Sequence, residues 1–393
     1  MSDQSALLNT NSDNPTFSPI NEVQNIAEKF DIHGEITAIS QIKKGYINHT
    51  YCVETLSEHG NVHKYILQRI NTNIFKNVDD LMYNFNVITN HLEGRLVLPG
   101  GHRKGSIQTI RHTKDGNLYF KGESGYWRML TYFDGVYSLD IPTSADLFYN
   151  AGVAFGRFVR ELSDVDVCDI KEIIPNFHNT KSRYFDLEAA IKADVKDRVK
   201  NVIPEIEFIR KRSDKYGIIS DALENGVIPK RICHNDCNLN NILFDEQSDL
   251  PVAIIDLDTV MPSSPLYDFG DSMRIGTNTA KDDEKDLSKV TCDLDLYEEY
   301  ARGYLSSCID ILEDNELKLL PYAALIITSE DGIRFLTDYI NGDTYYNIYY
   351  PGQNLDRART QLKLVEDMEK KLLQIKQILH DIYEEHGMSV IFD

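Results

Sequence analysis

The segment Arg231-Ile232-Cys233-His234-Asn235-Asp236-Cys237-Asn238-Leu239-Asn240-Asn241 decides the fold that we expect for this chain. His234, Asp236 and Asn241 stand in the order H-x-D-x-x-x-x-N of a kinase catalytic loop. In such a loop the Asp receives the proton of the acceptor hydroxyl and the Asn holds a magnesium ion. The segment therefore predicts a phosphoryl-transfer site with Asp236 as its catalytic residue and Asn241 as a metal ligand.

A second acidic residue, Asp256, directly follows an apolar, strand-like run at residues 250–255. A γ-phosphoryl group in transit carries negative charge, and Mg²⁺ prefers hard oxygen ligands. One carboxylate and one amide oxygen at neighbouring strand ends supply such ligands. We therefore expect Asp256 and Asn241 to bind Mg²⁺, and Asp258 is a candidate for a second ion or a metal-bound water.

The motif needs this wider context, because a lone His-x-Asp triplet is more often a buried turn with satisfied polar side chains. Asn241 at the right offset and Asp256 at the end of the next strand favour the functional interpretation. The chain also contains a literal Asp268-Phe269-Gly270, which matches the kinase metal motif. It follows a loop rich in Pro and Ser, so we interpret Asp268 as a helix cap or the partner of a nearby base.

Composition narrows the class of protein and of partner. The content of 42% hydrophobic and 26% charged residues is typical of a soluble globular protein. The 41 basic and 62 acidic residues give a formal net charge of −21, which argues against nucleic acid or an anionic membrane surface as partner. Residues 1–14 are polar, and no apolar run could span a bilayer. We expect a cytoplasmic monomer whose six scattered cysteines are free thiols.

The predicted elements divide the chain into a small and a large part. Residues 1–19 are rich in Ser, Asn and Asp and predict a mobile tail. Strand patterns and one amphipathic helix at 78–92 follow, and beyond them the chain is mainly helical. We expect an α+β, protein-kinase-like fold of two lobes. A small antiparallel-sheet, nucleotide-binding lobe would span 20–135, and a larger, mainly helical catalytic and substrate lobe would span 136–393.

Candidate nucleotide contacts lie at two places in the small lobe. The loop after its first strand would cover the ATP phosphates with backbone N–H groups, and Gly45 and Asn48 are its candidate contacts. The loop has a single glycine, so an ordinary hairpin is the alternative interpretation. Tyr132 and Phe133 end the last strand, where exposed backbone would bind adenine.

The strand at 63–70 should carry the cation that grips the phosphates. Aligned on the V-A-I-K strand of kinases, Gln68 stands in the Lys position, and Arg69 beside it points to the opposite face by strand alternation. We predict that a one-residue slip lets Arg69 reach the nucleotide. The alternatives are a base from elsewhere in the chain and a surface role for Arg69.

The segment from Cys233 to Gly276 resembles the aminoglycoside phosphotransferase and choline kinase superfamily. The strings that carry the resemblance are His234-Asn235-Asp236, Ile255-Asp256-Leu257-Asp258-Thr259-Val260-Met261-Pro262 and Leu266-Tyr267-Asp268-Phe269-Gly270-Asp271-Ser272. Within the superfamily the chain is most similar to the N-acetylhexosamine 1-kinases, from about Asn21 to the C-terminal helix. The resemblance implies ATP and Mg²⁺ as cofactors and a kinase fold.

A small acceptor is favoured over a protein acceptor, because the short stretch between Asp256 and Asp268 has no A-P-E-like tripeptide. The string from 332 to 346 joins an Arg, a Gly turn and a Tyr-rich loop, and the resemblance implies Arg334 and Tyr345 as sugar contacts. An ion pair of Arg334 with Asp338 is the alternative. The last candidate substrate contact, Asn238, stands where Lys is common among these kinases.

These observations predict an ATP-dependent kinase that phosphorylates a sugar hydroxyl. The foremost candidate is the anomeric hydroxyl of an N-acetylhexosamine, which would give the sugar 1-phosphate. A kinase of aminoglycosides, choline or another small alcohol is the alternative that the acidic composition leaves open. A nucleotide-binding pseudokinase scaffold would explain the missing strand Lys, but the presence of Asp236, Asn241 and Asp256 argues against it.

Overall fold

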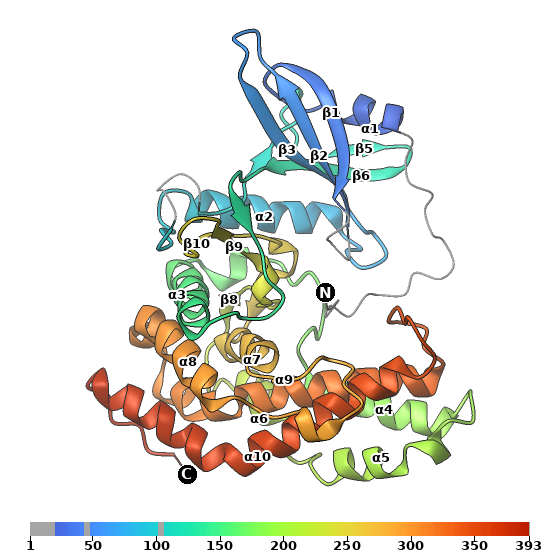
Figure 1. Ribbon diagram of the computed structural model, residues 1–393, viewed down its shortest axis with the longest axis vertical. Helices are drawn as coiled ribbons and strands as arrows, with labels where there is room; N and C mark the ends of the chain where they lie inside the picture. Colours follow the sequence, from blue (N-terminus) through green and yellow to red (C-terminus); the bar gives the residue numbers. More distant parts are fainter. Residues whose placement is uncertain (1–19, 43–47, 101–105, 393) are drawn as a thin grey trace.

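The structure is a computed structural model that describes residues 20–42, 48–100 and 106–392, arranged as a small sheet region above a larger helical region (Figure 1). The tail predicted at 1–19 and the candidate Gly45 lie outside the described residues. This arrangement confirms the two-lobed, kinase-like α+β fold.

An antiparallel sheet of six strands forms the small lobe, in the order β1-β2-β3-β6-β4, with β5 also paired to β6. The strands are β1 (Glu35–Ile42), β2 (His49–Leu56), β3 (Val62–Arg69), β4 (Ile110–Arg111), β5 (Phe120–Gly122) and β6 (Gly125–Thr131). β4 is the shortest of these strands, with two residues.

The two faces of this sheet are covered by different helices. Tyr65 and Leu67 of β3 pack with α1 (Ile20–Ala27), whereas Ile66 packs in the main core with α2 (Val78–Leu92). This alternation follows from the two-residue period of a strand. Any side chain on the Ile66 face therefore points toward α2 and the large lobe.

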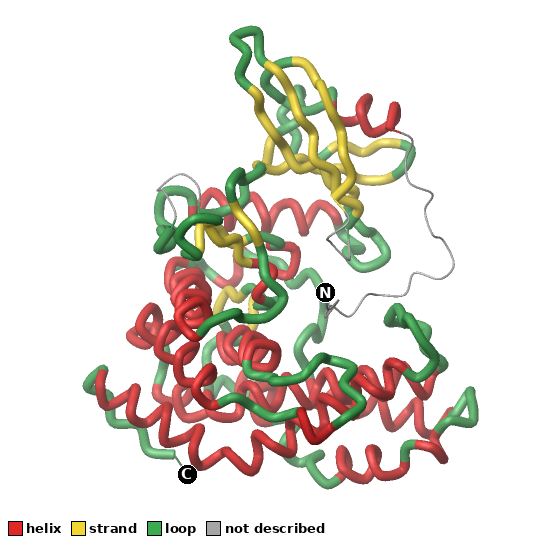
Figure 2. Tube along the Cα trace, in the orientation of Figure 1, coloured by secondary structure: helices red, strands yellow, loops and turns green. Residues whose placement is uncertain are grey.

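The large lobe contains two small sheets that carry the predicted catalytic segments. One has the order β10-β9-β7, and the other pairs β11 with β8. The strands are β7 (Val136–Tyr137), β8 (Arg231–Cys233), β9 (Ile242–Asp245), β10 (Pro251–Ile254) and β11 (Met261–Ser263). The strand segments lie above and among the helices that make up the rest of the lobe (Figure 2).

Eight α-helices of the described chain belong to this lobe. They are α3 (Ala145–Glu161), α4 (Thr180–Ala193), α5 (Ile203–Arg210), α6 (Ile218–Glu224), α7 (Pro265–Gly276), α8 (Leu294–Cys308), α9 (Asp314–Asn341) and α10 (Gln353–Glu385). Pro204 lies in the first turn of α5, where its missing N–H costs nothing.

Helices α3 and α8 approach each other closely at glycines. A Cβ on Gly152 would lie 2.5 Å from the Tyr300 carbonyl oxygen, and a Cβ on Gly303 would lie 2.0 Å from the Tyr149 carbonyl oxygen. Only glycine permits this backbone contact. The close packing fixes α8 behind the catalytic segment.

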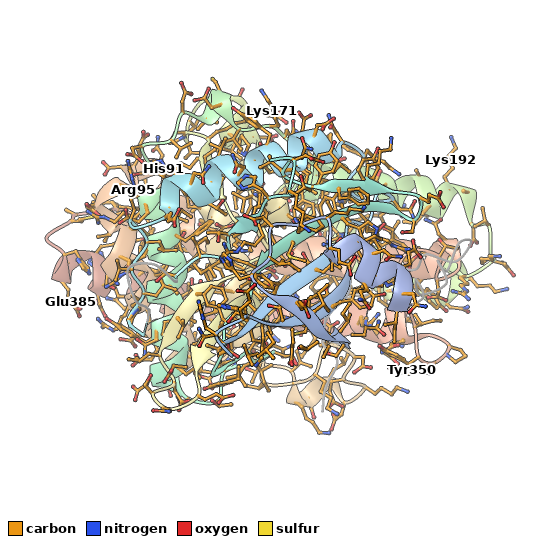
Figure 3. The ribbon with its side chains drawn as sticks, turned by 90° about the horizontal axis from the view of Figure 1, so that it is seen from above. His91, Arg95, Lys171, Lys192, Tyr350 and Glu385 are labelled. Carbon is orange, nitrogen blue, oxygen red and sulfur yellow. The ribbon has the colours of Figure 1, made fainter. Side chains whose placement is uncertain are left out.

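The chain crosses between the lobes in the few residues between β6 and β7, since β7 already pairs with β9 of the large lobe. A second connection lies at the end of α2, where His91 and Arg95 lie side by side (Figure 3). Both pair with the exposed Asp164, at 2.8 Å each. The boundary between the small and the large lobe at Gly135 stays a prediction. Among the described helices, none combines the length and the apolar character that a membrane crossing requires.

Candidate active site

The predicted catalytic loop is held by its backbone. β8 leads into it, and β8 pairs with β11, which leads directly to α7. Asp268 in the first turn of α7 accepts hydrogen bonds from the N–H groups of His234 at 2.9 Å and Asn235 at 2.7 Å. Burial raises the pKa of Asp268 to about 6, and the two N–H groups oppose this shift.

Our interpretation of Asp268 as a cap or the partner of a base is therefore wrong. Ser264 caps α7 by accepting from the Leu266 N–H, and Pro265 begins the helix. Asp268 is consequently helical rather than part of a loop, and it binds the backbone of the loop that carries Asp236.

The residue before Asp236 fixes the turn. Asn235 has φ = 64°, in the left-handed region that Asn tolerates better than most residues. Its side-chain amide donates to the carbonyl oxygens of Thr259 at 2.9 Å and Cys233 at 3.1 Å. The imidazole of His234 lies 3.1 Å from the Ile255 carbonyl oxygen, and burial lowers the pKa of His234 to about 4, so this ring is neutral. These bonds join the catalytic loop to the segment at Asp256.

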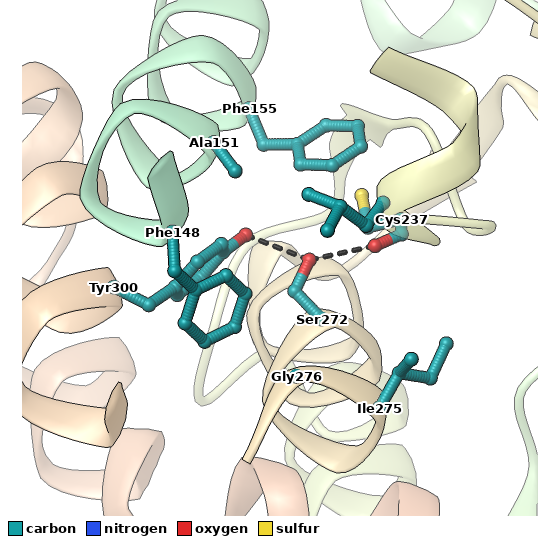
Figure 4. A pocket seen from close by; sticks show the side chains of 9 residues that line it. Phe148, Ala151, Phe155, Cys237, Ser272, Ile275, Gly276 and Tyr300 are labelled. Atoms are coloured by element: carbon teal, nitrogen blue, oxygen red, sulfur yellow. Dashed lines mark hydrogen bonds between the residues drawn. The ribbon is translucent and has the colours of Figure 1, made fainter. Parts of the chain in front are cut away.

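A polar chain supports the other side of the loop, next to a small cavity (Figure 4). Tyr300 of α8 donates to Ser272 Oγ, and Ser272 donates to the Cys237 carbonyl oxygen, both at 2.7 Å. Phe148 and Phe155 of α3 line the same cavity. The backbone on both sides of Asp236 is thus fixed by buried partners.

Asp236 itself is half-buried, and two amides orient its carboxylate. Asn238 donates to one oxygen, and Asn241 donates to the other at 3.1 Å. Burial and the nearby Asp271 raise the pKa of Asp236, while the hydrogen bond from Asn241 opposes this shift. Asn238, predicted to contact substrate, here positions the predicted catalytic residue.

The two predicted metal ligands lie on one hairpin. β9 and β10 pair so that Ile242 faces Ile254, and the Ile255 N–H donates to the Asn241 carbonyl at 2.9 Å. Asp256 follows with φ = 60° and is half-buried. Burial and the charges of Asp258 and Asp236 raise the pKa of Asp256.

This donor set fits a hard cation. The amide nitrogen of Asn241 is used by Asp236, which leaves the amide oxygen as its ligand atom. With the carboxylates of Asp236 and Asp256 close by, the site gathers oxygen atoms and negative charge, which suits Mg²⁺.

Asp258 does not fit the role of a second metal ligand that we considered for it. Its Oδ2 accepts from Asn48 at 2.8 Å and from Arg128 Nη2 at 2.9 Å, and its Oδ1 accepts from Arg128 Nη1. Both oxygens are therefore bound by the small lobe. Asn48, a predicted nucleotide contact, is therefore connected to the site by its hydrogen bond to Asp258.

The prediction that Arg69 reaches the nucleotide is wrong. β3 and β6 pair without a slip, with Gln68 opposite Arg128 and Arg69 opposite Trp127. Arg69 therefore shares the α1 face with Trp127, and Arg128 is the cation on the face toward the large lobe. Sequence reasoning missed Arg128, although an Arg in a strand otherwise rich in apolar residues was a visible signal.

The predicted hinge residues follow β6. The ammonium group of Lys64 lies 5.3 Å from the ring centroid of Tyr132 and pairs with Asp134 at 2.7 Å. Tyr132 and Phe133 are both half-buried. Their contact with adenine stays a prediction.

On the other side of Asp236, ion pairs connect α7 to α9. Arg274 pairs with Asp271 at 2.8 Å and with Asp331 at 3.1 Å. Asp331 also accepts from Arg334 at 3.2 Å. The row runs from beside Asp236 to Arg334, so the structure links this predicted sugar contact to the predicted catalytic residue.

The alternative pairing of Arg334 with Asp338 is wrong. Asp338 accepts instead from the backbone N–H groups of Tyr345 at 2.8 Å and Tyr346 at 2.9 Å, which fixes the Tyr-rich loop. Tyr345 is 48% exposed. The guanidinium of Arg334 lies 5.6 Å from the ring centroid of the buried Tyr346.

The comparisons with known proteins bear on this geometry. The model of the family described as "Phosphotransferase enzyme family" matches residues 38–307, which is more than half of the chain. The chain belongs to this phosphotransferase family. The match includes the small-lobe strands β2, β3 and β6 and the residues Asp236, Asn241 and Asp256, whereas Arg334 and Tyr345 lie beyond it.

Solved structures show that this phosphotransferase family member shares its fold with small-molecule kinases. An aminoglycoside phosphotransferase from Alicyclobacillus acidocaldarius is 12% identical with a TM-score of 0.59, and 91% of this chain and 96% of that chain are covered. Amicoumacin kinase hAmiN, in complex with AMP-PNP, Ca²⁺ and its ligand, is 13% identical with a TM-score of 0.54 and 96% of each chain covered. Choline kinase from Cryptosporidium parvum is 14% identical with a TM-score of 0.53, covering 92% of this chain and 98% of that chain.

Proposed function

We propose that this phosphotransferase is an ATP-dependent kinase of small neutral sugars that acts on the anomeric hydroxyl of an N-acetylhexosamine. The observation that carries the kinase assignment is the grouping of Asp236, Asn241 and Asp256. One half-buried carboxylate is oriented by amides, and a hard-oxygen donor set lies beside it. A scaffold protein without activity has no need of this arrangement.

In the proposed reaction the acceptor oxygen attacks the γ-phosphorus of ATP, the bond to the β–γ bridging oxygen breaks, and ADP leaves. Asp236 accepts a hydrogen bond from the acceptor hydroxyl and receives its proton. Its raised pKa makes it a stronger base than an exposed Asp. Asn238 and Asn241 hold the carboxylate in one orientation.

Mg²⁺, held by Asn241 and Asp256, would neutralise charge on the β- and γ-phosphates. The complex of amicoumacin kinase hAmiN with AMP-PNP and Ca²⁺ supports the use of a nucleotide and a divalent cation.

The charges around Asp236 support a neutral acceptor over a cationic one. Asp271 and Asp331 each have an Arg partner, and Arg274 bridges the two. A site for choline or an aminoglycoside needs acids or aromatic faces left over for the cation. Alternating guanidinium and carboxylate groups instead offer donors and acceptors to sugar hydroxyls.

An acceptor panel tests this proposal. We expect ADP release with ATP, Mg²⁺ and an N-acetylhexosamine, and little with choline or kanamycin. The 1-O-methyl glycoside of the same sugar, which lacks a free anomeric hydroxyl, is the matched control and should not react.

Phosphorylation of the methyl glycoside would move the reaction to another hydroxyl. Turnover of choline or kanamycin without turnover of any sugar would replace the acceptor class. Nucleotide binding without turnover of any acceptor would favour the pseudokinase alternative.

A further inference from the structure

Gln68, which the alignment on the V-A-I-K strand places in the Lys position of protein kinases, has Arg128 of β6 as its cross-strand neighbour. The two side chains share one face of the sheet and are hydrogen-bonded. Gln68 Oε1 accepts from Arg128 Nε at 2.9 Å and from Nη2 at 2.8 Å. Gln68 therefore fixes the plane of the guanidinium.

The guanidinium then forms a two-point ion pair with Asp258. Nη1 and Nη2 of Arg128 donate to the two different carboxylate oxygens, the second at 2.9 Å. The Arg128 side chain is 1% exposed and that of Asp258 is 3% exposed. Such a pair is little screened by solvent and is geometrically specific.

Asn48, which directly precedes β2, also binds Asp258. Asn48 donates to Asp258 at 2.8 Å, and the Asn71 N–H donates to Asn48 Oδ1 at 3.0 Å. Asn48 and Arg128 of the small lobe thus bind one acid of the large lobe, and Gln68 holds Arg128 in place.

Helix α2 completes the contrast with a protein kinase, in which the strand Lys pairs with a Glu of the lobe helix. Here α2 places the Phe85 ring 5.1 Å from the Arg128 guanidinium, and Asn84 donates to the Val260 carbonyl at 3.2 Å. The helix therefore supplies packing and an amide. The acid that pairs with the strand cation is instead Asp258, in the segment that follows Asp256.

We propose that the Arg128–Asp258 pair takes the place of the Lys–Glu pair and positions Asp256 for binding the nucleotide with its metal. Asp258 lies two residues after Asp256, within the 3-10 turn Leu257–Thr259. A displacement of one carboxylate therefore displaces the other. Arg128 is a positioning residue rather than a phosphate ligand, because its side chain is buried and four of its five N–H groups already donate to Gln68 and Asp258. The inference rests on the proposed kinase function.

The first test compares Arg128→Lys and Asp258→Asn with the control Arg212→Lys. Arg128→Lys keeps the charge but loses the two-point geometry. Arg212 donates from Nε and Nη2 to the two different oxygens of Glu369, a similar two-point pair that joins the segment after α5 to α10 away from the site. We expect the KM for ATP and the Mg²⁺ concentration for half-maximal rate to rise about tenfold in both site variants.

The KM for the acceptor should stay within about twofold in these variants, because the acceptor contacts lie on the other side of Asp236. Arg212→Lys should lower the Tm while leaving the KM for ATP unchanged. A site variant that changes only the Tm or the amount of folded protein, as the control does, would overturn the positioning role.

A second test asks whether the two residues act as one unit. The double variant Arg128→Gln/Asp258→Asn should bind ATP no more weakly than the weaker-binding of the single variants Arg128→Gln and Asp258→Asn, since either change already breaks the pair. Additive losses would overturn the inference. Adding Gln68→Lys to Arg128→Gln should recover at least part of the lost affinity, and no recovery would overturn the equivalence with a strand Lys.

Direct titration of Mg²⁺ with AMP-PNP keeps these results separate from the proposed function. Binding of Mg²⁺–AMP-PNP needs no acceptor. If the wild type phosphorylated none of the acceptors, the kinase assignment would be removed, but the positioning role of the Arg128–Asp258 pair would stand. Equal affinities of wild type, Arg128→Lys and Asp258→Asn for Mg²⁺–AMP-PNP would remove the inference while leaving the kinase assignment in place.

Discussion

The catalytic loop around Asp236 and the segment at residues 256–260, here called the metal loop, each depend on one buried Asp, but the two acids work in opposite ways. Asp268 reaches from α7 to two backbone N–H groups of the catalytic loop, within one lobe. Asp258 belongs to the metal loop and is held by side chains from the other lobe. One loop is therefore anchored through backbone N–H groups, which every residue except proline has, and the other through the side chains of Asn48 and Arg128.

This difference has a physical consequence. Every residue except proline has a backbone N–H group, so this anchor of the catalytic loop tolerates changes other than to proline at His234 and Asn235. The anchoring of the metal loop fails when either member of one ion pair is lost, because the remaining charge is then buried without a partner.

The largest expected effect lies at Asp236, between the two anchors. Asp236→Asn should lower kcat by about 10²–10⁴-fold because the amide cannot receive a proton. Binding of Mg²⁺–AMP-PNP and the Tm should stay close to those of the wild type, which steady-state kinetics and nucleotide titration would check. A kcat near that of the wild type would remove Asp236 from its role and make the comparison of its two anchors irrelevant to catalysis.

The anchor of the catalytic loop is tested by Asp268→Asn. One of the two N–H groups would then face an amide NH₂ in place of a carboxylate oxygen, which should lower the free energy of unfolding by about 3 kcal/mol. The kcat should fall while the KM for ATP changes little, the opposite of the pattern expected for Asp258→Asn.

The exposed Asp286, which accepts from the Ser288 N–H at 3.2 Å, provides the control. Asp286→Asn should change the free energy of unfolding by less than about 0.5 kcal/mol. If Asp268→Asn raised the KM for ATP and left kcat unchanged, the two anchors would not be distinct.

Another support of the catalytic loop depends on pH. His178 lies 2.8 Å from the Asn235 carbonyl and 3.2 Å from Glu330, so both ring nitrogens face acceptors, and its ring stacks on Tyr267. Burial opposes the charged ring, but Glu330, the carbonyl and the nearby charge of Asp271 raise its pKa on balance. The protonated form is the one that stabilises the fold.

The stabilisation by His178 should be complete below pH 6.5 and should be lost as the pH rises through the raised pKa. His178→Gln should remove about 2 kcal/mol from the free energy of unfolding at pH 6 and less at pH 9. Urea unfolding over this range measures the difference, with the less buried His380→Gln as control. The same loss at both pH values would show that the pair with Glu330 is not protonation-dependent.

The smallest effect is expected at Arg69, on the other face of the sheet. Arg69→Gln should leave the KM for ATP within about twofold and change the free energy of unfolding by less than about 0.5 kcal/mol. Measured beside Arg128→Lys, it separates the two faces of one sheet. A tenfold rise in the KM for ATP would restore Arg69 as a nucleotide contact.

Short-range patterns in the sequence were sufficient for part of this structure. The two-lobed fold and the proximity of Asp236, Asn241 and Asp256 follow from a loop and a hairpin that are local in the chain. Strand alternation also placed Gln68 and Arg69 on opposite faces.

Long-range pairing was not available from the same patterns. Arg128 meets Gln68 because β6 pairs with β3 across the intervening α2, β4 and β5, and no local signal gives that strand order. The position of Asp268 was indicated locally, since Ser264 and Pro265 are typical of a helix start. Its backbone partners depend on where α7 packs, which the sequence pattern does not define.

The Arg128–Asp258 pair also limits how this architecture can be recombined. A chimaera that joins the small lobe of one relative to the large lobe of another would bring together Asn48, Gln68 and Arg128 from one parent with position 258 from the other. Unless the second parent also has an acid at position 258, the chimaera buries the Arg128 guanidinium without a charged partner, at a cost of several kcal/mol. The two lobes of this chain are therefore poor candidates for exchange as separate modules.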